Sequence, residues 1–339
     1  MDNNNSKPLH TEKTLKKVVS CSNLTVGYGY FVVQANLNLE LHAGELVCLI
    51  GPNGSGKSTL MRTLAGLQKP LSGKTLISDK NINLLSTQEK ARLISMVLTD
   101  RVDVENARVF DIVSLGRYPH THWWGGVSAE DDRIIRETIK MVHLEEKTEH
   151  LMSQLSDGER QRAMIARALA QDTPIVLLDE PTAHLDLPNR VEIMLLLHKL
   201  AHETGKGILL STHELDLALQ AGDRIWLMDA KKGVECGTPE DLVFNGSFNR
   251  TFESENYIFN PDNGNFSMNY RLQKNISVSG DKTRMYWTLR ALARAGFQVV
   301  EQADTEIIVN PTNWLLNGRE VNSVEELLYC LQKNIIEHK

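Results

Sequence analysis

The sequence lacks the features of several protein classes. Its four cysteines are scattered and none belongs to a C-x-x-C pair, which predicts isolated thiols in a reducing compartment. No apolar run approaches the ~18 residues that a membrane-spanning helix requires. The first fifteen residues are polar and lack the apolar stretch of a signal peptide, so we expect a frayed, disordered tail over residues 1–17 and a cytoplasmic protein.

Excess positive charge is also missing. The net charge is -6 and the isoelectric point is about 6.0, which argues against a general nucleic-acid binder. Hydrophobic residues make up 41% of the 339 positions and charged residues 24%, proportions that are ordinary for a globular protein with a full core. The length allows one large domain with a small one, or two domains.

One short segment matches the phosphate-binding pattern G-x-x-x-x-G-K-[ST]. Glycines at this spacing let backbone N–H groups turn inward around a phosphate. Lys57 would reach the β- and γ-phosphates, and the hydroxyl of Ser58 would ligate Mg²⁺. A buried strand over residues 45–50 precedes the segment, and a helix over residues 58–65 follows it. The predicted nucleotide-binding residues are Gly51, Pro52, Asn53, Gly54, Ser55, Gly56, Lys57, Ser58 and Thr59.

Strand-like and helix-like segments alternate along the chain. Residues 18 to about 50 read as strands. Further on, amphipathic helical segments alternate with short apolar strands, an order that is typical of a mostly parallel core sheet and an α/β fold. The expected helices cover residues 128–142, 158–170 and 188–204, and the expected strands cover residues 74–77, 174–178 and 207–211.

The apolar strand that includes residues 175–178 ends in two carboxylates, Asp179 and Glu180. Asp179 is placed to hold Mg²⁺, directly or through water. Glu180 is placed to act as the general base on an attacking water. The alternative is a solvated acidic turn, which the phosphate-binding pattern upstream disfavours.

Residues 155–162, with the sequence L-S-D-G-E-R-Q-R, complete a recognisable order of motifs. The order of motifs is the phosphate loop, this signature, the acidic strand end, A-H-L-D at 183–186 and S-T-H-E at 211–214. This order resembles that of the ATP-binding-cassette (ABC) superfamily over about residues 18–245. The resemblance implies an ABC-type P-loop ATPase core over residues 18–260. That core has an antiparallel β subdomain and a helical subdomain at about 100–170.

The resemblance also implies roles for single residues. Tyr28 matches the aromatic residue that stacks on the adenine of ATP. Ser156 and the backbone of Gly158 match the signature that binds the γ-phosphate held by a second copy in a head-to-tail dimer. Asp186 matches the loop that couples the two sites, and His213 matches a histidine that contacts the γ-phosphate. Without the resemblance, Ser156 would read as a helix cap and His213 as a core histidine.

The sequence departs from the family pattern in three places. The signature has Asp157 where glycine is usual and Glu159 where glutamine is usual. Because aspartate tolerates unusual backbone angles, we expect binding to survive, although a carboxylate near a triphosphate disfavours it. The family's loop glutamine is missing near residues 97–100. Thr99 is the best positional match and the expected neighbour of Mg²⁺ through a water molecule, and Asp100 is the other candidate.

Two further segments resemble a subfamily, the ATPase subunits of importers for iron-siderophore, haem and cobalamin complexes. They are D-I-V-S-L-G-R-Y-P at 111–119 and W-W-G at 123–125, followed by S-A-E-D at 128–131. The resemblance implies that this region packs against a membrane permease subunit, with large side chains at the interface. These side chains are Tyr118, Trp123 and Trp124, for which ordinary core packing is the alternative. His120 and His122 form an H-x-H pair without a third ligand nearby, so we expect no metal there.

The segment at 270–339 reads as a separate, small α+β unit. A turn-rich stretch around Asn263-Gly264 precedes it. The expected order is βαββα, with strands at 276–280, 297–300 and 307–309 and helices at 282–295 and 324–335. A ligand sensor, a dimer contact and a structural appendage all remain open as its role.

Together these patterns predict the ATP-hydrolysing subunit of a membrane ABC importer, for an iron chelate, haem or cobalamin, with ATP and Mg²⁺ as cofactors. We expect a head-to-tail homodimer bound to multi-span permease subunits, peripheral on the inner face of the membrane, and served indirectly by a substrate-binding protein. The alternatives are a soluble ABC ATPase acting on ribosomes or DNA and a degenerate nucleotide-binding scaffold. Neither a second cassette nor a long coiled coil supports the soluble class. Glu180 and His213 argue against the scaffold.

Overall fold

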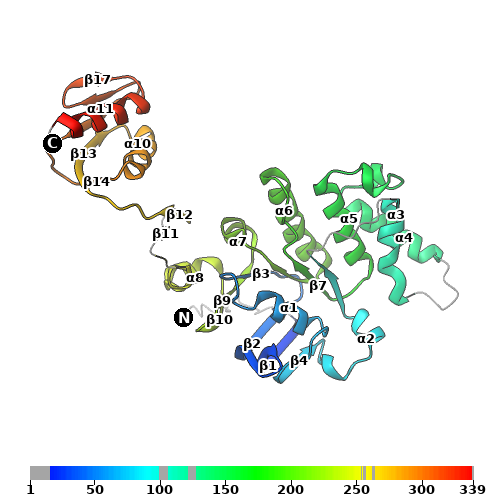
Figure 1. Cartoon of the computed structure of the whole chain (residues 1–339). Helices are drawn as coiled ribbons and strands as arrows, with labels where there is room; N and C mark the ends of the chain where they lie inside the picture. Colours follow the sequence, from blue (N-terminus) through cyan, green and yellow to red (C-terminus); the bar gives the residue numbers. More distant parts are fainter. Residues whose placement is uncertain are drawn as a thin grey trace, which may run out of the picture. The chain divides into compact units, whose positions relative to one another are not determined.

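A computed structural model describes residues 16–98, 106–120, 127–252, 254, 257–261 and 264–337. The chain divides into two compact units (Figure 1). The first comprises residues 1–252 and 261–265, and the second comprises residues 253–260 and 266–339. Each unit has its own buried apolar cluster, so each is described by itself. The predicted domains, 18–260 and 270–339, stay a prediction about which segments fold independently.

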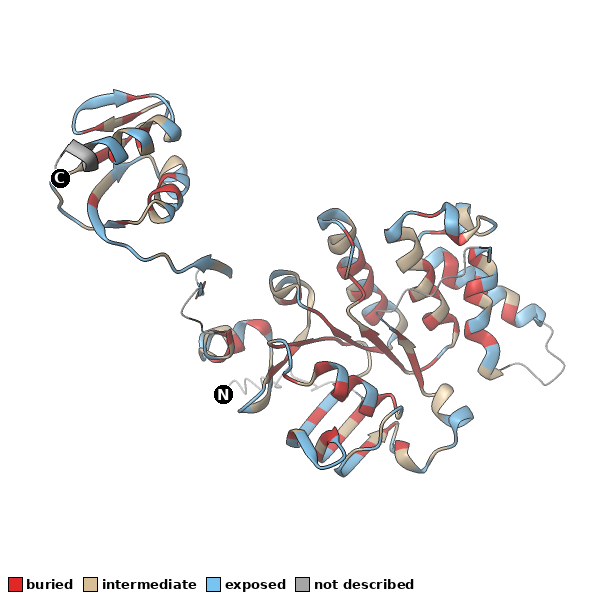
Figure 2. Cartoon of the chain, in the orientation of Figure 1, coloured by how far each residue is buried: buried red, intermediate tan, exposed pale blue. Residues whose placement is uncertain are grey.

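A six-stranded sheet forms the centre of the first unit, with the strand order β10-β9-β3-β8-β7-β6. All neighbours are parallel except β10 and β9. Every residue of β3 and β8 is buried, which explains their continuous apolar sequences (Figure 2). The strands are β3 (Leu46–Ile50), β6 (Ile94–Val97), β7 (Ile175–Asp179), β8 (Gly207–Ser211), β9 (Arg224–Asp229) and β10 (Gly233–Gly237).

Helices α1, α6 and α7 contact this sheet, and α8 and α9 follow it in the chain. Helix α6 begins with the side chain of Asp186 accepting a hydrogen bond from the Asn189 N–H, and it ends at Gly205 in the left-handed conformation. The bounds are α1 (Lys57–Leu64), α6 (Leu187–Thr204), α7 (Leu215–Ala221), α8 (Pro239–Phe244) and α9 (Ser247–Phe252). The helices and strands predicted for this core are therefore present, with ends that differ by one or two residues.

A four-stranded antiparallel sheet with the order β2-β1-β4-β5 makes the predicted β subdomain. Its apolar face shares one buried cluster with the central sheet, in which Val26 and Leu41 join Leu60 of α1 and Trp226 of β9. The elements are β1 (Lys17–Tyr28), β2 (Phe31–His42), β4 (Ser72–Ile77), β5 (Lys80–Asn81), the short helix η1 (Ile82–Leu84) and α2 (Thr87–Ala91). This shared core fixes β1 and β2 beside the start of α1.

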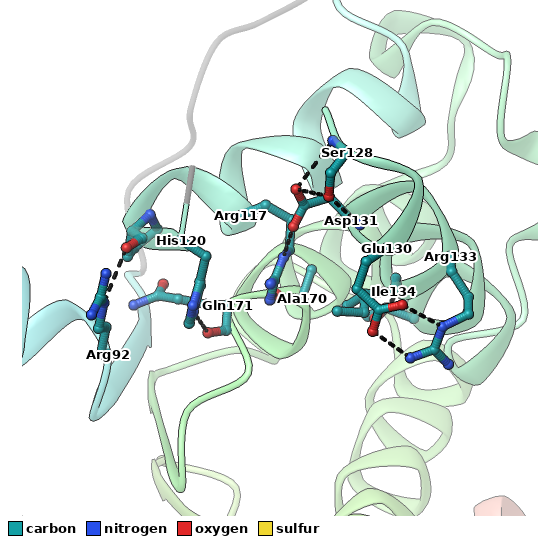
Figure 3. A network of polar contacts seen from close by, with 12 residues as sticks. Arg92, Arg117, His120, Ser128, Glu130, Asp131, Arg133, Ile134, Ala170 and Gln171 are labelled. Carbon is teal, nitrogen blue, oxygen red and sulfur yellow. Dashed lines mark hydrogen bonds and ion pairs between the residues drawn. The ribbon is translucent and has the colours of Figure 1, made fainter. Parts of the chain in front are cut away.

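The helical subdomain is held by a buried polar network (Figure 3). The Arg117 guanidinium donates to the Asp131 carboxylate at 2.8 Å and to the Ala170 carbonyl at 2.7 Å. Arg117 and Asp131 are each only 7% exposed. Hydrogen bonds from Ser128 and from Arg117 lower the pKa of Asp131. The elements are α3 (Val109–Ser114), η2 (Leu115–His120), α4 (Ala129–Met141), η3 (Glu145–Lys147), η4 (Met152–Gln154) and α5 (Asp157–Ala170).

The second unit packs two helices with a five-stranded sheet of order β14-β13-β15-β16-β17. The hairpin β16–β17 was not predicted, so the order is βαββββα after residue 273 rather than βαββα. Asn317 and Gly318 have positive φ and form its turn. The elements are β11 (Tyr257–Asn260), β12 (Asn265–Met268), β13 (Lys274–Gly280), α10 (Lys282–Arg294), β14 (Phe297–Val299), β15 (Glu306–Val309), β16 (Trp314–Leu316), β17 (Arg319–Val321) and α11 (Val324–Glu337).

Across the residues that the structure describes, no helix is both long enough and apolar enough to span a bilayer.

The first prediction concerns the buried Arg117–Asp131 pair. Arg117→Met leaves the Asp131 carboxylate buried without its cationic partner, and this costs about 3 kcal/mol or more. Because the native pKa of Asp131 is lowered, its stabilisation is complete at pH 7 and is lost only as the pH falls through that pKa. Urea titration at pH 7, followed by circular dichroism, should show a clearly lower midpoint.

The matched control is Arg133→Met on α4, whose side chain is 56% exposed and pairs with Glu130 (Figure 3) and with Glu137. Such exposed pairs contribute less than ~1 kcal/mol. Equal midpoints for the two variants would contradict a structural role for the buried pair.

Candidate functional site

The turn from β3 into α1 forms a cradle in which two positions admit only glycine. A Cβ added at Gly51 would lie 2.2 Å from the Met228 carbonyl oxygen, and one at Gly56 would lie 2.4 Å from Val33 Cγ1. Gly56, with a φ of 105°, also precedes α1 in the left-handed region. The two glycines thus let the loop pack closely against β9 and β2 and lead into the start of α1, whose first N–H groups have no partner within the helix and suit a phosphate.

Two polar side chains in the cradle fit an anion. The Ser55 hydroxyl is buried and has no hydrogen-bond partner among the described residues. Lys57 Nζ donates to the carbonyls of Gly51 at 2.8 Å and Pro52 at 3.3 Å. Burial lowers the pKa of Lys57, while the carboxylates of Glu180 and Asp179 act to raise it. The residues present therefore fit a triphosphate.

Tyr28 lies at the end of β1, next to the cradle. Its hydroxyl is 3.0 Å from the Thr59 hydroxyl in the first turn of α1. The Tyr28 side chain is 51% exposed, so its ring face is open to a ligand. This position is compatible with the stacking role that was predicted for Tyr28.

Gln34 on β2 is a component of the site that sequence reasoning missed. It is 4% exposed, and its side-chain amide donates to the Ser55 carbonyl at 3.0 Å and to the Asp229 carbonyl at 2.7 Å. It therefore ties the cradle to the β subdomain and to the end of β9. The only signal in the sequence is a polar residue at a buried strand position, which is too weak to identify it.

The two carboxylates at the end of β7 face different partners. Ser211 Oγ donates to Asp179 at 2.5 Å and accepts from the Glu180 N–H at 3.1 Å. Glu180 has a φ of 50°, unusual for a residue with a side chain. His213 Nε2 is 2.6 Å from the Glu180 carboxylate.

These carboxylates lie close enough to Lys57 to act on its pKa. Strand β8 carries Ser211 and lies between β3, which leads into the cradle, and β7. The structure thus brings the phosphate loop, Asp179, Glu180 and His213 together at the carboxyl end of the sheet. Ligands of open α/β sheets bind at this edge.

The signature residues form a helix start with an unexpected internal contact. Ser156 Oγ accepts from the Glu159 N–H at 3.3 Å, and the Glu159 carboxylate accepts from the Ser156 N–H at 2.8 Å and from Ser156 Oγ at 3.0 Å. Ser156 therefore caps α5, and its backbone hydrogen bond is the main cause that lowers the pKa of Glu159. The charge of Glu159 lies beside Ser156.

The next two signature residues, Asp157 and Gly158, differ in how the structure bears on the prediction. Asp157 is the first residue of α5 and has an ordinary helical conformation, so no unusual backbone angle is needed there. At Gly158, a Cβ would lie 2.2 Å from the Asn189 Oδ1 of α6. Asn189 also donates to the Asp186 carboxylate at 2.6 Å. Glycine at 158 thus allows the signature helix to pack against the segment that contains Asp186.

Several predicted residues lie outside the described part of the chain. They are Thr99, Asp100, His122, Trp123 and Trp124. Strand β6 ends at Val97, just before the undescribed residues 99–105. Tyr118 is described and is 80% exposed. His120 Nε2 lies 2.9 Å from the Gln171 carbonyl, so this ring has a structural contact (Figure 3).

The sequence matches two protein-family models. Residues 34–183 match the ABC transporter family, and residues 273–332 match the iron ABC transporter C-terminal domain. An ABC transporter ATP-binding protein of Methanocaldococcus jannaschii, itself uncharacterized, is 39% identical over 77% of this chain and 90% of that protein. A probable siderophore transport ATP-binding protein of Bacillus subtilis is 37% identical over 66% and 82%. The ferric enterobactin transport ATP-binding protein of Escherichia coli is 34% identical over 65% and 81%.

Solved structures agree with this relationship. An ABC transporter assigned to the metal-chelate type, in an inward-facing conformation, has a TM-score of 0.61 and 27% identity, covering 70% of this chain and 89% of that chain. A dimeric ATP-binding cassette in a post-hydrolysis state, bound to ADP and phosphate, has a TM-score of 0.55 and 32% identity, covering 65% and 98%.

The fold, the phosphate cradle and the acidic strand end define an ABC-type ATPase. More particularly, the chain belongs to the ABC transporter ATP-binding proteins of the iron–siderophore importer family. The predicted family, fold class and ATPase activity are confirmed. ABC ATPases dimerise, and in metal-chelate transporters they pair with permease subunits. The roles assigned to single residues stay predictions.

A second prediction concerns Gln34. Gln34→Leu leaves the Ser55 and Asp229 carbonyls without their donor, at a cost of about 1–3 kcal/mol. We expect a lower thermal midpoint and about three- to tenfold weaker binding of a fluorescent ATP analogue. The control Gln220→Leu removes an exposed amide on α7 that donates a hydrogen bond to the Asp216 carboxylate of the same helix. If the two variants bound the analogue equally well, Gln34 would not position the cradle.

Proposed function

We propose that this chain is the ATP-hydrolysing subunit that drives import of an iron chelate. The observation that carries the proposal is the cluster of Lys57, Asp179, Glu180 and His213 at one edge of the sheet. The cargo class rests on the iron ABC transporter C-terminal domain at residues 273–332 and on relatives named for siderophore and ferric enterobactin transport. The ion in the chelate is cargo and does not enter the ATPase site.

The phosphate loop, residues 51–59, is proposed to hold the triphosphate of ATP. The backbone N–H groups and Lys57 would surround the β- and γ-phosphates, and Tyr28 would stack on adenine. Ser58 and Asp179 offer oxygen ligands that suit Mg²⁺, and solvent completes its octahedral shell. Bound Mg²⁺ would neutralise charge on the β- and γ-phosphates. Thr99 is proposed to contact this ion through a water molecule.

Glu180 is proposed as the general base for the attacking water, and His213 as a contact of the γ-phosphate. In the single subunit His213 Nε2 and the Glu180 carboxylate are in contact at 2.6 Å. A γ-phosphate that contacts His213 would compete with Glu180 for this side chain. The Glu180 carboxylate would then be released to orient a water molecule, so ATP itself would help to prepare the base.

A second copy of the chain is proposed to complete each site. Ser156 and the backbone N–H groups around Gly158 would approach the γ-phosphate across a head-to-tail dimer. The Glu159 carboxylate now accepts the hydrogen bonds of Ser156 that a phosphate oxygen would use. Asp186, through Asn189, lies close to the signature of the same subunit. This gives a physical connection between the two composite sites.

The other proposed partners are membrane permease subunits, and indirectly a substrate-binding protein. Tyr118 on η2 is an exposed aromatic residue that suits such an interface. We place the protein on the cytoplasmic face of the membrane, held there through the permease. Nucleic acid is not among the proposed partners, because the net charge of -6 does not favour it.

The third prediction tests the base. Glu180→Gln keeps the shape of the side chain and removes the carboxylate, so ATP should still bind while turnover falls by at least ~10²-fold. Steady-state phosphate release and gel filtration with ATP should show a slow enzyme that accumulates as a dimer. The control Glu240→Gln, exposed at the start of α8, should keep normal turnover. Near-normal hydrolysis by Glu180→Gln would contradict the assignment.

The fourth prediction concerns Glu159. Glutamine also completes a capping box, so Glu159→Gln should preserve α5 while it removes a negative charge near the partner's triphosphate. In the Glu180→Gln background, the ATP concentration needed for half-maximal dimerisation should fall about three- to tenfold. Gel filtration or light scattering against ATP concentration measures this.

Glu89→Gln on α2 is the matched control. Glu89 forms the same kind of capping box with Ser86, at a helix start outside the signature, and its pKa is lowered first by the Ser86 backbone hydrogen bond. This variant should leave the ATP concentration for dimerisation unchanged. An unchanged or higher requirement in Glu159→Gln would show that its charge does not oppose nucleotide binding in trans.

A further inference from the structure

Two histidines of α6 lie close to an aspartate that precedes β9. None of the three belongs to the proposed ATPase site. His198 and His202 are four residues apart on α6, so their side chains lie on one face of the helix. Asp223 precedes β9. Asp223 Oδ1 is 3.1 Å from His202 Nε2 and 3.6 Å from His198 Nε2. One ligand atom from each residue lies within 4.8 Å of the other two.

The two oxygens of Asp223 have different tasks. Oδ2 accepts from the Leu46 N–H at 2.7 Å, and the Asp223 N–H donates to the Leu46 carbonyl at 2.9 Å. The carboxylate is thus fixed against the start of β3, and Oδ1 faces both imidazoles. A carboxylate that is held in this way by a further hydrogen bond is typical of metal ligands.

The spacing suits a small divalent ion. For tetrahedral zinc with bonds of about 2.0–2.1 Å, neighbouring ligand atoms are about 3.3 Å apart. The observed separations from Asp223 Oδ1, 3.1 and 3.6 Å, lie on either side of that value. The two imidazole rings, with centroids 4.5 Å apart, already converge. Coordination would require the Nε2 protons to be replaced by the ion, with small ring movements.

The surroundings permit entry and charge balance. The side chains of His198 and His202 are 44% and 48% exposed, and Asp223 is 27% exposed, so solvent can reach the cluster. The neighbouring cation Arg224 is directed to Glu45, with Nε 3.5 Å from its carboxylate. Cys48 lies close to Asp223, but it is fully buried and is not part of the cluster.

We propose that His198, His202 and Asp223 form a second metal site, which binds a borderline divalent transition metal such as Zn²⁺ and is distinct from the Mg²⁺–ATP site. Two imidazoles and one carboxylate favour zinc over the hard ion Mg²⁺, which prefers oxygen ligands. Water would complete the shell. The bound ion would connect the carboxyl-terminal half of α6 to the start of β3, the strand that leads into the phosphate cradle.

The test is zinc binding by the full-length, nucleotide-free protein in competition with a chromogenic chelator. Nucleotide is omitted because ATP itself binds zinc. Wild type should bind one equivalent of zinc. His202→Ala and Asp223→Asn should bind zinc at least ~10-fold more weakly. Asparagine at 223 keeps an oxygen acceptor for the Leu46 N–H, so this variant tests the charge without removing the structural hydrogen bond.

His150→Ala, in the helical subdomain, is the control for a histidine outside the cluster, and it should bind zinc as wild type does. Circular dichroism of each variant checks the fold. Co²⁺ provides a second readout, because a nitrogen- and oxygen-ligated tetrahedral site gives visible absorption that His202→Ala should lose. The proposal is overturned if wild type takes up no zinc, or if His202→Ala and Asp223→Asn bind it as tightly as His150→Ala does. In that case the cluster is only a hydrogen bond between His202 and Asp223 with a second histidine beside it.

Discussion

The structure depends on one constraint, namely that the backbone of the phosphate loop must curl while it packs closely against the neighbouring strands. Gly51 and Gly56 satisfy it, since a Cβ at Gly51 would lie 2.2 Å from the Met228 carbonyl oxygen and one at Gly56 would lie 2.4 Å from Val33 Cγ1. The constraint extends outward. A fully buried strand must hold one end of the loop, a helix must begin at the other end, and Gln34 must fix the loop from the side. The shared core of the two sheets keeps β2 close enough for that contact.

The charged side chains around the cradle contact other groups of the same subunit. Lys57 donates hydrogen bonds to carbonyl groups, Asp179 accepts one from Ser211, and Glu180 is in contact with His213. Each of these side chains therefore has a partner within the subunit, as buried or half-buried polar groups usually do. In the proposed function, a triphosphate with its cation would replace these contacts. Within the cradle, the buried Ser55 hydroxyl differs from them, because it has no hydrogen-bond partner among the described residues.

The sequence alone predicts those features whose pattern lies within one short segment of the chain. The phosphate loop is nine consecutive residues, and the core strands and helices follow the apolar periodicity of their own segments. Contacts between distant segments left no such signal. Gln34 reaches the Asp229 carbonyl across 195 residues, and Asp223 meets His198 and His202 only because β9 lies beside β3. The hairpin β16–β17 was missed because strands of three residues are too short to show a period. The helical conformation of Asp157 could not be read from residue preference either.

The proposed division of the site between two copies would explain why the signature can tolerate Glu159. Within one subunit, Glu159 has a structural role, because it completes the capping box of α5 with Ser156. In the proposed dimer, the same carboxylate would become unfavourable when a second subunit presents its triphosphate, since like charges repel most strongly when water is excluded. A residue can in this way stabilise the fold of the monomer and oppose the dimer. Such a residue would set the ATP concentration at which two subunits close, without touching the proposed general base Glu180 or the proposed γ-phosphate contact His213 in its own chain.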